Sequence, residues 1–278
     1  VIIPAPYWVS YPDIVLLADA TPIIVSASID QEFKIHPDQL DRTISRKTRL
    51  LVINSPSNPT GAIYTRAELE ALGEVLRQHP HVLIATDDMY EHILWSKEPF
   101  CNILNACPDL KDRTMVLNGV SKVYAMTGWR IGYAAGPKPL IAAMRKIQSQ
   151  STSNPTSIAQ VAAEAALNGD QACIAPMVRA FKERHDRVVQ RLNRIRGVRC
   201  LASQGTFYAF PDFSKAIAAT PGVNNDVELA DYILNKAEVA LVPGSAFGAE
   251  GHLRFSYATS METLDKALDR IEKLLGTT

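Results

Sequence analysis

One stretch decides how this chain folds: Asn118-Gly-Val-Ser-Lys-Val-Tyr-Ala-Met-Thr-Gly-Trp-Arg-Ile-Gly-Tyr133. It follows directly after the apolar run Met115–Leu117, which has the composition of a buried strand. Ligands of open α/β sheets bind at the carboxyl ends of the strands, so Lys122 stands where a reactive group belongs. Small residues on both sides of this lysine leave room for a bulky ligand.

Two other side chains of the stretch suit an anion. The hydroxyl of Ser121 can donate a hydrogen bond to it, and the planar guanidinium of Arg130 fits a phosphate group. A single lysine after a strand is usually a solvated surface charge, so Lys122 alone would indicate little. The prediction of a reactive site rests on the stretch as a whole.

Apolar runs and helix-length amphipathic segments alternate along the first part of the chain. The expected strands are Ile23–Val25, Leu50–Ile53, Val82–Ala85 and Met115–Leu117. Their near-continuous apolar composition is typical of parallel strands that are buried on both faces. The expected helices are Thr65–His79, Pro139–Ser149 and Ser157–Asn168, of which the first opens with the capping box of Thr65 and Glu68. This alternation predicts an α/β fold, in which three layers (α/β/α) enclose a mainly parallel central sheet.

The pattern changes after about residue 170. Gln171–Arg196 reads as one long helix, and only short strands follow it. These strands are expected at Phe207–Phe210, Val239–Val242 and Leu253–Tyr257, with helices at Asp226–Lys236 and Met261–Leu275. The last helix is expected to open with a second capping box, Thr259 with Glu262. We therefore predict a large domain over residues 1–180 and a smaller α+β C-terminal domain over residues 181–278.

Composition narrows the class of protein. The chain has 278 residues, enough for a large domain and a smaller one. Its 29 Lys and Arg residues balance 29 Asp and Glu residues, which gives no reason to expect nucleic acid or an anionic membrane as partner. No apolar run approaches the ~20 residues that span a bilayer. The four cysteines lack metal-ligand spacing, as do the six histidines, so we expect reduced thiols, no metal site and a cytoplasmic location.

The first residues read as the end of a buried strand. Val1-Ile2-Ile3-Pro4 is apolar, and neither an initiator methionine nor the charges of a signal peptide precede it. We therefore expect that a substantial N-terminal piece of the protein precedes this sequence.

The stretch around Lys122 resembles the cofactor-attachment signature of the class I/II aminotransferases, enzymes that depend on pyridoxal 5'-phosphate (PLP). The matching positions are Gly119, Val120, Ser121, Lys122, Ala125, Met126, Gly128, Arg130, Ile131 and Gly132. The resemblance covers the whole chain and is strongest to the bacterial aspartate aminotransferase type. It implies the PLP-transferase fold type I, with Lys122 holding PLP as a Schiff base and Gly119, Ser121 and Arg130 in the cofactor site.

The same resemblance assigns two residues of Ala85-Thr-Asp-Asp-Met-Tyr90. In the family, the Asp of an Asp-x-x-Tyr motif pairs with the pyridinium nitrogen of PLP, and the Tyr bonds its 3-oxygen. The spacing selects Asp87 rather than Asp88 as the partner of Tyr90. A carboxylate close to the ring nitrogen raises the pKa of that nitrogen, because it stabilises the cation. Loop carboxylates that cap the next helix are the alternative interpretation.

Three more positions match the family. Asn58 belongs to Asn-Pro-Thr-Gly, which suits a turn and in the family binds both the cofactor's 3-oxygen and the substrate. Trp8 is expected to stack on the PLP ring, with Tyr7 as the fallback and an aromatic of the core as the alternative. Arg254 is expected to bind the α-carboxylate of the substrate, although an arginine on an alternating strand is normally a surface residue.

The resemblance implies an activity and an assembly. Ser153-Asn154-Pro155 is similar to a segment that reaches the neighbouring subunit's site in dimeric relatives, which implies a homodimer. The expected reaction transfers the amino group of an L-amino acid, with aspartate favoured, to a 2-oxo acid, with 2-oxoglutarate favoured. Lys122, Asp87 and Tyr90 are the expected catalytic residues.

Other functions stay open at this point. One is a different PLP reaction on the same fold, such as an aromatic or prephenate aminotransferase or a β-lyase. The other is a non-catalytic fragment or the module of a regulator. The presence of Lys122, Asp87, Arg130 and Arg254 together favours catalysis, and no basic segment for reading DNA is visible.

Overall fold

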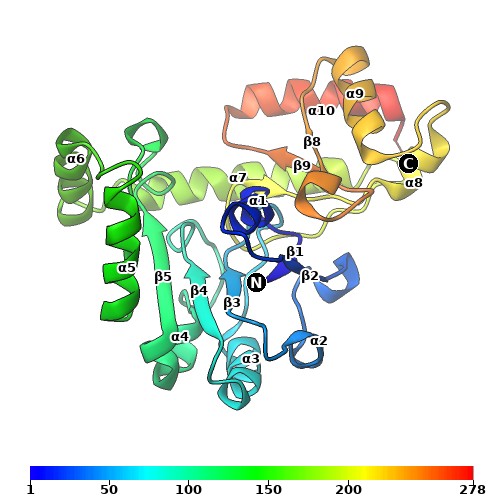
Figure 1. Ribbon diagram of the computed structural model, residues 1–278. Coiled ribbons are helices and arrows are strands. Elements are labelled where there is room, and N and C mark those ends of the chain that lie inside the picture. Colours follow the sequence, from blue (N-terminus) through cyan, green and yellow to red (C-terminus); the bar gives the residue numbers. More distant parts are fainter. Residues whose placement is uncertain (278) are drawn as a thin grey trace. The chain divides into compact units, whose positions relative to one another are not determined.

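The computed structural model describes residues 1–277 (Figure 1). The chain folds into two compact units, each assembled from several stretches. The first unit consists of Val1–Ile2, His36–Pro56 and Tyr64–Val178. The second consists of Ile3–Ile35, Ser57–Ile63 and the residues from Arg179 onward. The domain boundary at residue 180 stays a prediction.

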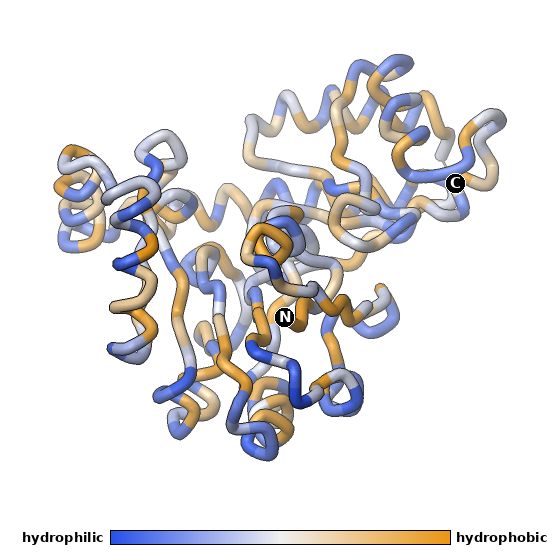
Figure 2. Tube along the Cα trace, viewed as in Figure 1, coloured by the Kyte–Doolittle hydropathy of each residue, from blue (hydrophilic) through white to orange (hydrophobic). Residues whose placement is uncertain are grey.

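A mainly parallel sheet organises the first unit. Four of its strands lie in this unit: β3 (Leu50–Asn54), β4 (Leu83–Asp87), β5 (Thr114–Gly119) and β6 (Gly132–Ala135). The sheet also includes β1 (Ile2–Ala5) and β2 (Ile23–Ser26), which belong to the second unit from Ile3 onward. The strand order is β2-β1-β3-β4-β5-β6. The pairs β1–β3, β3–β4 and β4–β5 are parallel, and β6 runs antiparallel to β5. Figure 2 shows hydrophobic residues along β3 and β4, as expected for strands buried in the core.

Helices alternate with the strands along the first unit, which is the alternation that the sequence predicts. They are α2 (Pro37–Thr43), α3 (Arg66–Gln78), α4 (Ile103–Ala106), α5 (Lys138–Ser149) and α6 (Ser157–Asn168), with 3-10 turns η2 (Pro108–Arg113) and η3 (Thr127–Trp129). The predicted capping box opens α3: Thr65 Oγ1 accepts from Glu68 N at 3.2 Å, and Glu68 Oε2 accepts from Thr65 N at 2.7 Å. The predicted α/β fold class is confirmed.

The second unit holds a small antiparallel sheet in the order β7-β9-β8. Its elements are α1 (Ser10–Leu17), η1 (Ile29–Gln31), β7 (Tyr208–Ala209), α8 (Ser214–Ala219), α9 (Asp226–Ala237), β8 (Val242–Pro243), η4 (Gly244–Phe247), β9 (Leu253–Ser256) and α10 (Met261–Leu275). Helix α7 (Ile174–Leu192) begins in the first unit and continues into the second. Helices α9 and α10 lie side by side (Figure 1).

Several expected elements need correction. Helix α7 is shorter than the expected Gln171–Arg196, and β8 starts at Val242, where Val239–Val242 had been the expected strand. The N-cap of α10 is Ser260, which accepts from Thr263 N, and not Thr259. Ile23 and Ile24 of β2 are 44% and 39% exposed, so β2 is not buried on both faces. Its apolar composition gave no means of distinguishing a covered face from an uncovered one.

One buried cation holds α7 against α10. The side chain of Arg191 is 8% exposed, and its Nε donates to Glu272 Oε1 at 2.6 Å. Its Nη2 donates to Glu272 Oε2 at 2.7 Å and to Asp269 Oδ1 at 2.6 Å. Asp265 receives the more exposed Arg187 on the same helix pair. The bidentate geometry around Arg191 makes it the main polar contact between these helices.

Removing Arg191 should destabilise the protein far more than removing Arg187. Arg191→Ala leaves the half-buried carboxylate of Glu272 without its cation, so we expect the free energy of unfolding to fall by about 3 kcal/mol. Arg187→Ala, which removes a solvated pair, should cost about 1 kcal/mol or less. Urea unfolding measures both. Equal losses in the two variants would show that the buried network contributes no more than a surface ion pair.

Candidate active site

The ends of three parallel strands lie in register in the first unit. Asn54 at the end of β3 pairs with Asp87 at the end of β4, and Asp87 pairs with Leu117 in β5. The loop that carries Lys122 leaves β5 two residues after Leu117, at Gly119. Because parallel strands end at one edge of a sheet, Asp87 and the Lys122 loop both belong to the carboxyl edge, where ligands bind in such folds.

The loop with Lys122 is closed at its base by two glycines. Gly119 of β5 pairs with Gly132 of β6, so the residues between them form one loop. A Cβ atom on Gly119 would lie 3.1 Å from the methyl carbon of Met89 and 3.2 Å from Gly132 Cα. A side chain at this position would therefore make tight contacts with β6 and Met89. Strand β6 was missed in the sequence, although Gly132 belongs to the motif that was recognised.

Within the loop, Lys122 and Ser121 are partly buried and Arg130 is exposed. The carbonyl of Lys122 accepts from Ala125 N at 3.2 Å, which forms a tight turn directly after the lysine. Arg130 has a left-handed backbone (φ 51°), and its Nη1 donates to Thr127 O at 2.9 Å. The guanidinium thus stays on the loop that carries Lys122. That places two cationic side chains and the Ser121 hydroxyl on one segment.

Asp87 is the last residue of β4, and Tyr90 lies on the turn that follows. The backbone carbonyl of Asp87 accepts from Asn54 Nδ2 at 2.9 Å, and its Oδ1 accepts from Met89 N at 3.2 Å. Tyr90 is buried. The structure therefore places both residues of the Asp-x-x-Tyr motif at the end of the strand beside β5.

The neighbouring carboxylate has a different environment. Asp88 is 1% exposed, and its two oxygens accept from Thr86 Oγ1 and Asn102 Nδ2, both at 2.6 Å. Burial raises the pKa of the Asp88 carboxyl to about 6, against the opposing effect of these two hydrogen bonds. Because both oxygens of Asp88 are engaged within the fold, this arrangement favours Asp87 as the carboxylate that meets a ligand. The sequence analysis assigned no role to Asp88. The only sequence feature that could have drawn attention to it is its position directly after Asp87.

The carboxylate of Glu91 connects the turn after β4 to strand β5. Glu91 Oε1 accepts from Asn118 Nδ2 at 2.8 Å, and Asn118 Oδ1 accepts from Gly119 N at 2.7 Å. The pKa of Glu91 is lowered, first by its hydrogen bond with His92 and also by that with Asn118. The turn with Tyr90 is therefore tied to the strand that leads to Lys122. Neither Glu91 nor Asn118 was singled out in the sequence.

In the second unit, Asn58 lies in the turn that Asn-Pro-Thr-Gly predicted. Ser57 N donates to Ala62 O at 3.0 Å, and Gly61 N donates to Ser57 O at 2.8 Å. Gly61 has φ 69°, and a Cβ there would lie 2.6 Å from the Cβ of Ser203, so this position requires glycine. The turn is thereby packed against residues 203–205.

Arg254 contacts this turn directly. It lies on β9, and its Nη1 donates to Asn58 Oδ1 at 3.0 Å. The amide of Asn58 also carries two N–H donors on its nitrogen, which suits it to bind an oxygen as well as to orient Arg254. The structure thus brings together the two residues for which a substrate role was predicted.

The aromatic candidates Trp8 and Tyr7 differ in how they are held. Trp8 is 38% exposed and contacts the ring of Tyr11 edge to face, with centroids 5.4 Å apart. Tyr7 N donates to Phe247 O at 3.1 Å, and a Cβ on Gly248 would lie 2.6 Å from the Tyr7 ring. Tyr7 is therefore fixed in the packing of the second unit. The more exposed ring of Trp8 favours it as the residue that can stack on a ligand.

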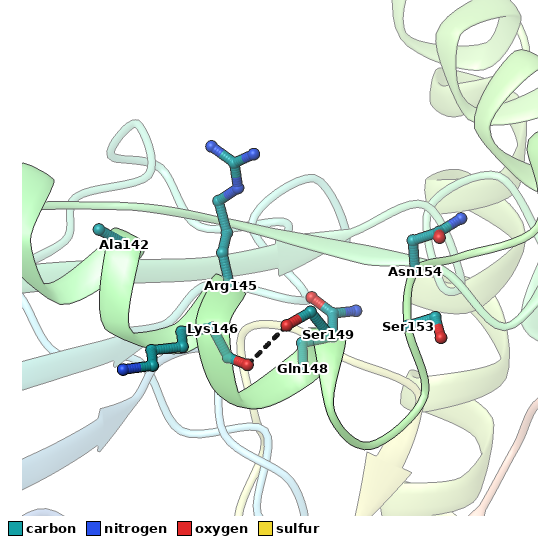
Figure 3. Close-up of a pocket in the computed structure, with 7 residues that line it drawn as sticks. All are labelled: Ala142, Arg145, Lys146, Gln148, Ser149, Ser153 and Asn154. Atoms are coloured by element: carbon teal, nitrogen blue, oxygen red, sulfur yellow. Dashed lines mark hydrogen bonds between the residues drawn. The ribbon is translucent and has the colours of Figure 1, made fainter.

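A surface pocket of the first unit holds part of the segment predicted to face a neighbouring subunit. Figure 3 shows its lining residues, which are Ala142, Arg145, Lys146, Gln148, Ser149, Ser153 and Asn154. The side chains of Arg145 and Lys146 point in different directions, and Ser149 Oγ donates to Lys146 O at 2.7 Å. This pocket contains none of the residues predicted for the cofactor.

Residues 1–277 provide neither a membrane-spanning helix nor a cluster of metal ligands. No helix in this part of the chain combines the length and the apolar character needed to cross a membrane. No group of three or more His, Cys, Asp or Glu side chains within it could hold a metal ion.

The lysine loop and the Asp-x-x-Tyr motif lie on neighbouring strands at the carboxyl edge of a parallel sheet, as the resemblance to the aminotransferases implies. The family model for aminotransferase class I and II matches residues 1–271, and the chain belongs to that family. The resemblance inferred from the Lys122 stretch is therefore confirmed.

Named relatives agree with this assignment. The chain is 61% identical to an aspartate/prephenate aminotransferase of Nitrosomonas europaea, over 99% of this chain and 71% of that protein. It is 49% identical to an aspartate aminotransferase of Geobacillus stearothermophilus, over 99% of this chain and 70% of that protein. The crystal structure of the aspartate aminotransferase from Rhizobium meliloti superposes with a TM-score of 0.93 at 45% identity, covering 97% of this chain and 68% of that one.

The raised pKa of Asp88 predicts how stability depends on pH. The folded protein holds this proton more tightly than the unfolded chain, in which an Asp titrates near about 4. Ionisation of Asp88 therefore destabilises the fold increasingly as the pH rises from about 4 to about 6. Below about pH 4 the carboxyl is protonated in both states and has no such effect. We expect the free energy of unfolding of Asp88→Asn, relative to wild type, to increase by on the order of 2 kcal/mol across it. Urea unfolding at several pH values measures this, and a difference that stays constant from pH 4 to 7 would contradict it.

Proposed function

We propose that this protein transfers the amino group of aspartate to a 2-oxo acid, with PLP attached to Lys122. The observation that carries the proposal is the position of Lys122 and Asp87 on loops of neighbouring parallel strands, joined by the hydrogen bond from Asn118 to Glu91. The aspartate aminotransferases among the relatives support the choice of donor.

The side chains of the first unit fit the chemical groups of PLP. The amine of Lys122 suits its aldehyde, and the carboxylate of Asp87 suits its ring nitrogen. The phenol of Tyr90 is a donor for its 3-oxygen, and the cation of Arg130 with the hydroxyl of Ser121 suits its phosphate.

When bound, PLP supplies an electron-withdrawing ring that stabilises negative charge on the substrate's α-carbon. Asp87 holds the proton on the ring nitrogen, because its carboxylate stabilises that cation. The amine of Lys122 holds the cofactor covalently and, once released, moves the α-proton as a general base. Tyr90 donates to the 3-oxygen and orients the ring.

The residues of the second unit keep the roles that the family resemblance gives them. Trp8 offers a ring for stacking, Arg254 binds the α-carboxylate of the amino acid, and Asn58 orients Arg254 and donates to an oxygen. A planar guanidinium and a carboxylate form two parallel hydrogen bonds, which fix both the position and the direction of the substrate.

The proposal also specifies the amino acceptor. We infer 2-oxoglutarate as the general acceptor. Prephenate is the second candidate, because relatives of Nitrosomonas europaea and Cereibacter sphaeroides are named aspartate/prephenate aminotransferases. A homodimer and a cytoplasmic location complete the proposal.

Loss of the lysine amine should abolish catalysis without unfolding the protein. We expect Lys122→Ala in the full-length protein to lower kcat for aspartate and 2-oxoglutarate by about 10³-fold or more, because both the covalent attachment and the general base are lost. Borohydride reduction followed by mass spectrometry of the Lys122 peptide measures attachment directly. Attachment at another lysine in wild type would refute the assignment of Lys122.

Loss of the Arg254 guanidinium should weaken the substrate and spare the cofactor. We expect Arg254→Ala to raise the Kd for aspartate by about 10²-fold, since a charge-assisted pair is lost, and to change the Kd for PLP by less than about threefold. Arg254→Lys should recover only part of the affinity, because an ammonium cannot form the planar pair. Equal losses for aspartate and PLP would mean that Arg254 is structural.

A further inference from the structure

The guanidinium of Arg254 packs against two aromatic rings. Its Cζ is 4.5 Å from the ring centroid of Tyr208 and 4.9 Å from that of Phe247. Both distances are within the range in which an aromatic face attracts a cation. An arginine on a short strand of a small sheet is normally solvated, so this packing is a specific feature of the second unit.

Residues of the second unit surround both rings. Tyr208 is paired with Ser256 across β7 and β9, and in an antiparallel pair Arg254 is its diagonal neighbour on the same face. Phe247 is 1% exposed and belongs to a core cluster with Ile29, Phe33 and Phe210. Its ring contacts that of Phe210 edge to face, with centroids 5.8 Å apart. Both rings are therefore buried, Tyr208 at 7% and Phe247 at 1% exposure.

The hydrogen-bond donors of Arg254 are used unequally. Nη1 donates to Asn58 Oδ1, and this bond fixes the rotation of the guanidinium in its plane. Nε is buried and has no hydrogen-bond partner among the residues that the structure describes. The remaining donors, one hydrogen on Nη1 and both hydrogens on Nη2, can bind an anion.

We propose that Tyr208 and Phe247 are positioning residues that hold the Arg254 guanidinium flat and dry for an incoming carboxylate. This inference rests on the proposed function and adds how its substrate arginine is prepared. Where a ring packs against the guanidinium, a ligand cannot stack on it, and a carboxylate meets it in its plane through two hydrogen bonds. The rings exclude competing water, and the guanidinium loses little freedom when the substrate binds.

Single-turnover kinetics with L-aspartate test the proposal in the full-length, PLP-loaded protein. Tyr208→Leu and Phe247→Leu should each raise the Kd for L-aspartate by about tenfold, as expected for the loss of one buried cation–aromatic contact. The limiting rate constant and PLP retention should stay within about threefold of wild type. Tyr208→Phe keeps the ring and should behave as wild type.

Phe213→Leu is the matched control. It removes a fully buried ring of the same unit that makes no stacking contact with Arg254. A general loosening of the unit would raise the Kd in this control as well.

A second measurement needs no activity. Phenylglyoxal reacts with accessible guanidinium groups, and mass spectrometry of the Arg254 peptide follows its rate in protein without cofactor. We expect the reaction at Arg254 to be several-fold faster in Tyr208→Leu and Phe247→Leu than in wild type, Tyr208→Phe and Phe213→Leu. This readout also decides the question if one of the leucine variants fails to fold, because the other still reports.

The outcomes separate the two claims. Wild type that binds PLP but does not react with aspartate would contradict the proposed function. The phenylglyoxal rates would still test whether Tyr208 and Phe247 cover Arg254. Leucine variants with unchanged Kd and unchanged reaction rates at Arg254 would overturn the inference. A higher Kd in Phe213→Leu equal to that in Tyr208→Leu would overturn it too, since the effect would then be general.

Discussion

The in-register alignment of three parallel strands is the constraint on which the candidate site depends. Because β3, β4 and β5 pair residue for residue, Asn54 and Asp87 end their strands at the level of Leu117 in β5. The loop with Lys122 can then leave β5 beside the turn that carries Asp87 and Tyr90. Its return through β6 brings Gly119 close to Gly132 and Met89, where a side chain would make tight contacts.

Polar groups around this edge give it rigidity at a cost in stability. Asp88 is a carboxylate that two neutral donors hold inside the protein, and burial of such a group is unfavourable unless every oxygen is satisfied. Its bonds connect the end of β4 to Asn102, which also caps α4. Glu91 connects the same turn to β5 through Asn118. The two acids fix the turn from both sides, which leaves Asp87 and Tyr90 in defined positions.

Patterns of residues close in sequence predicted much of this structure. Contacts between residues far apart in the sequence were not predicted. Helix α6, the capped start of α3 and the strands β3 to β5 follow from apolar periodicity and capping residues near in sequence. Strand β6 did not, because Gly132 and two alanines look like a loop. The motif located Lys122 and Asp87, since its spacing is local. The rings around Arg254 come from residues up to 46 positions away, and the strand pairing that brings Tyr208 to Arg254 leaves no trace in a single sequence.

The central claim is that Lys122 and Asp87 serve one reaction, the removal of the amino group of aspartate on PLP. The most direct test is the visible absorption spectrum of the PLP-loaded, full-length protein before and after addition of L-aspartate, with the 2-oxo acid product quantified in parallel. The account predicts that the absorption of the bound cofactor changes and that one equivalent of oxaloacetate appears per active site. Tightly bound PLP with an unchanged spectrum and no oxaloacetate would contradict it.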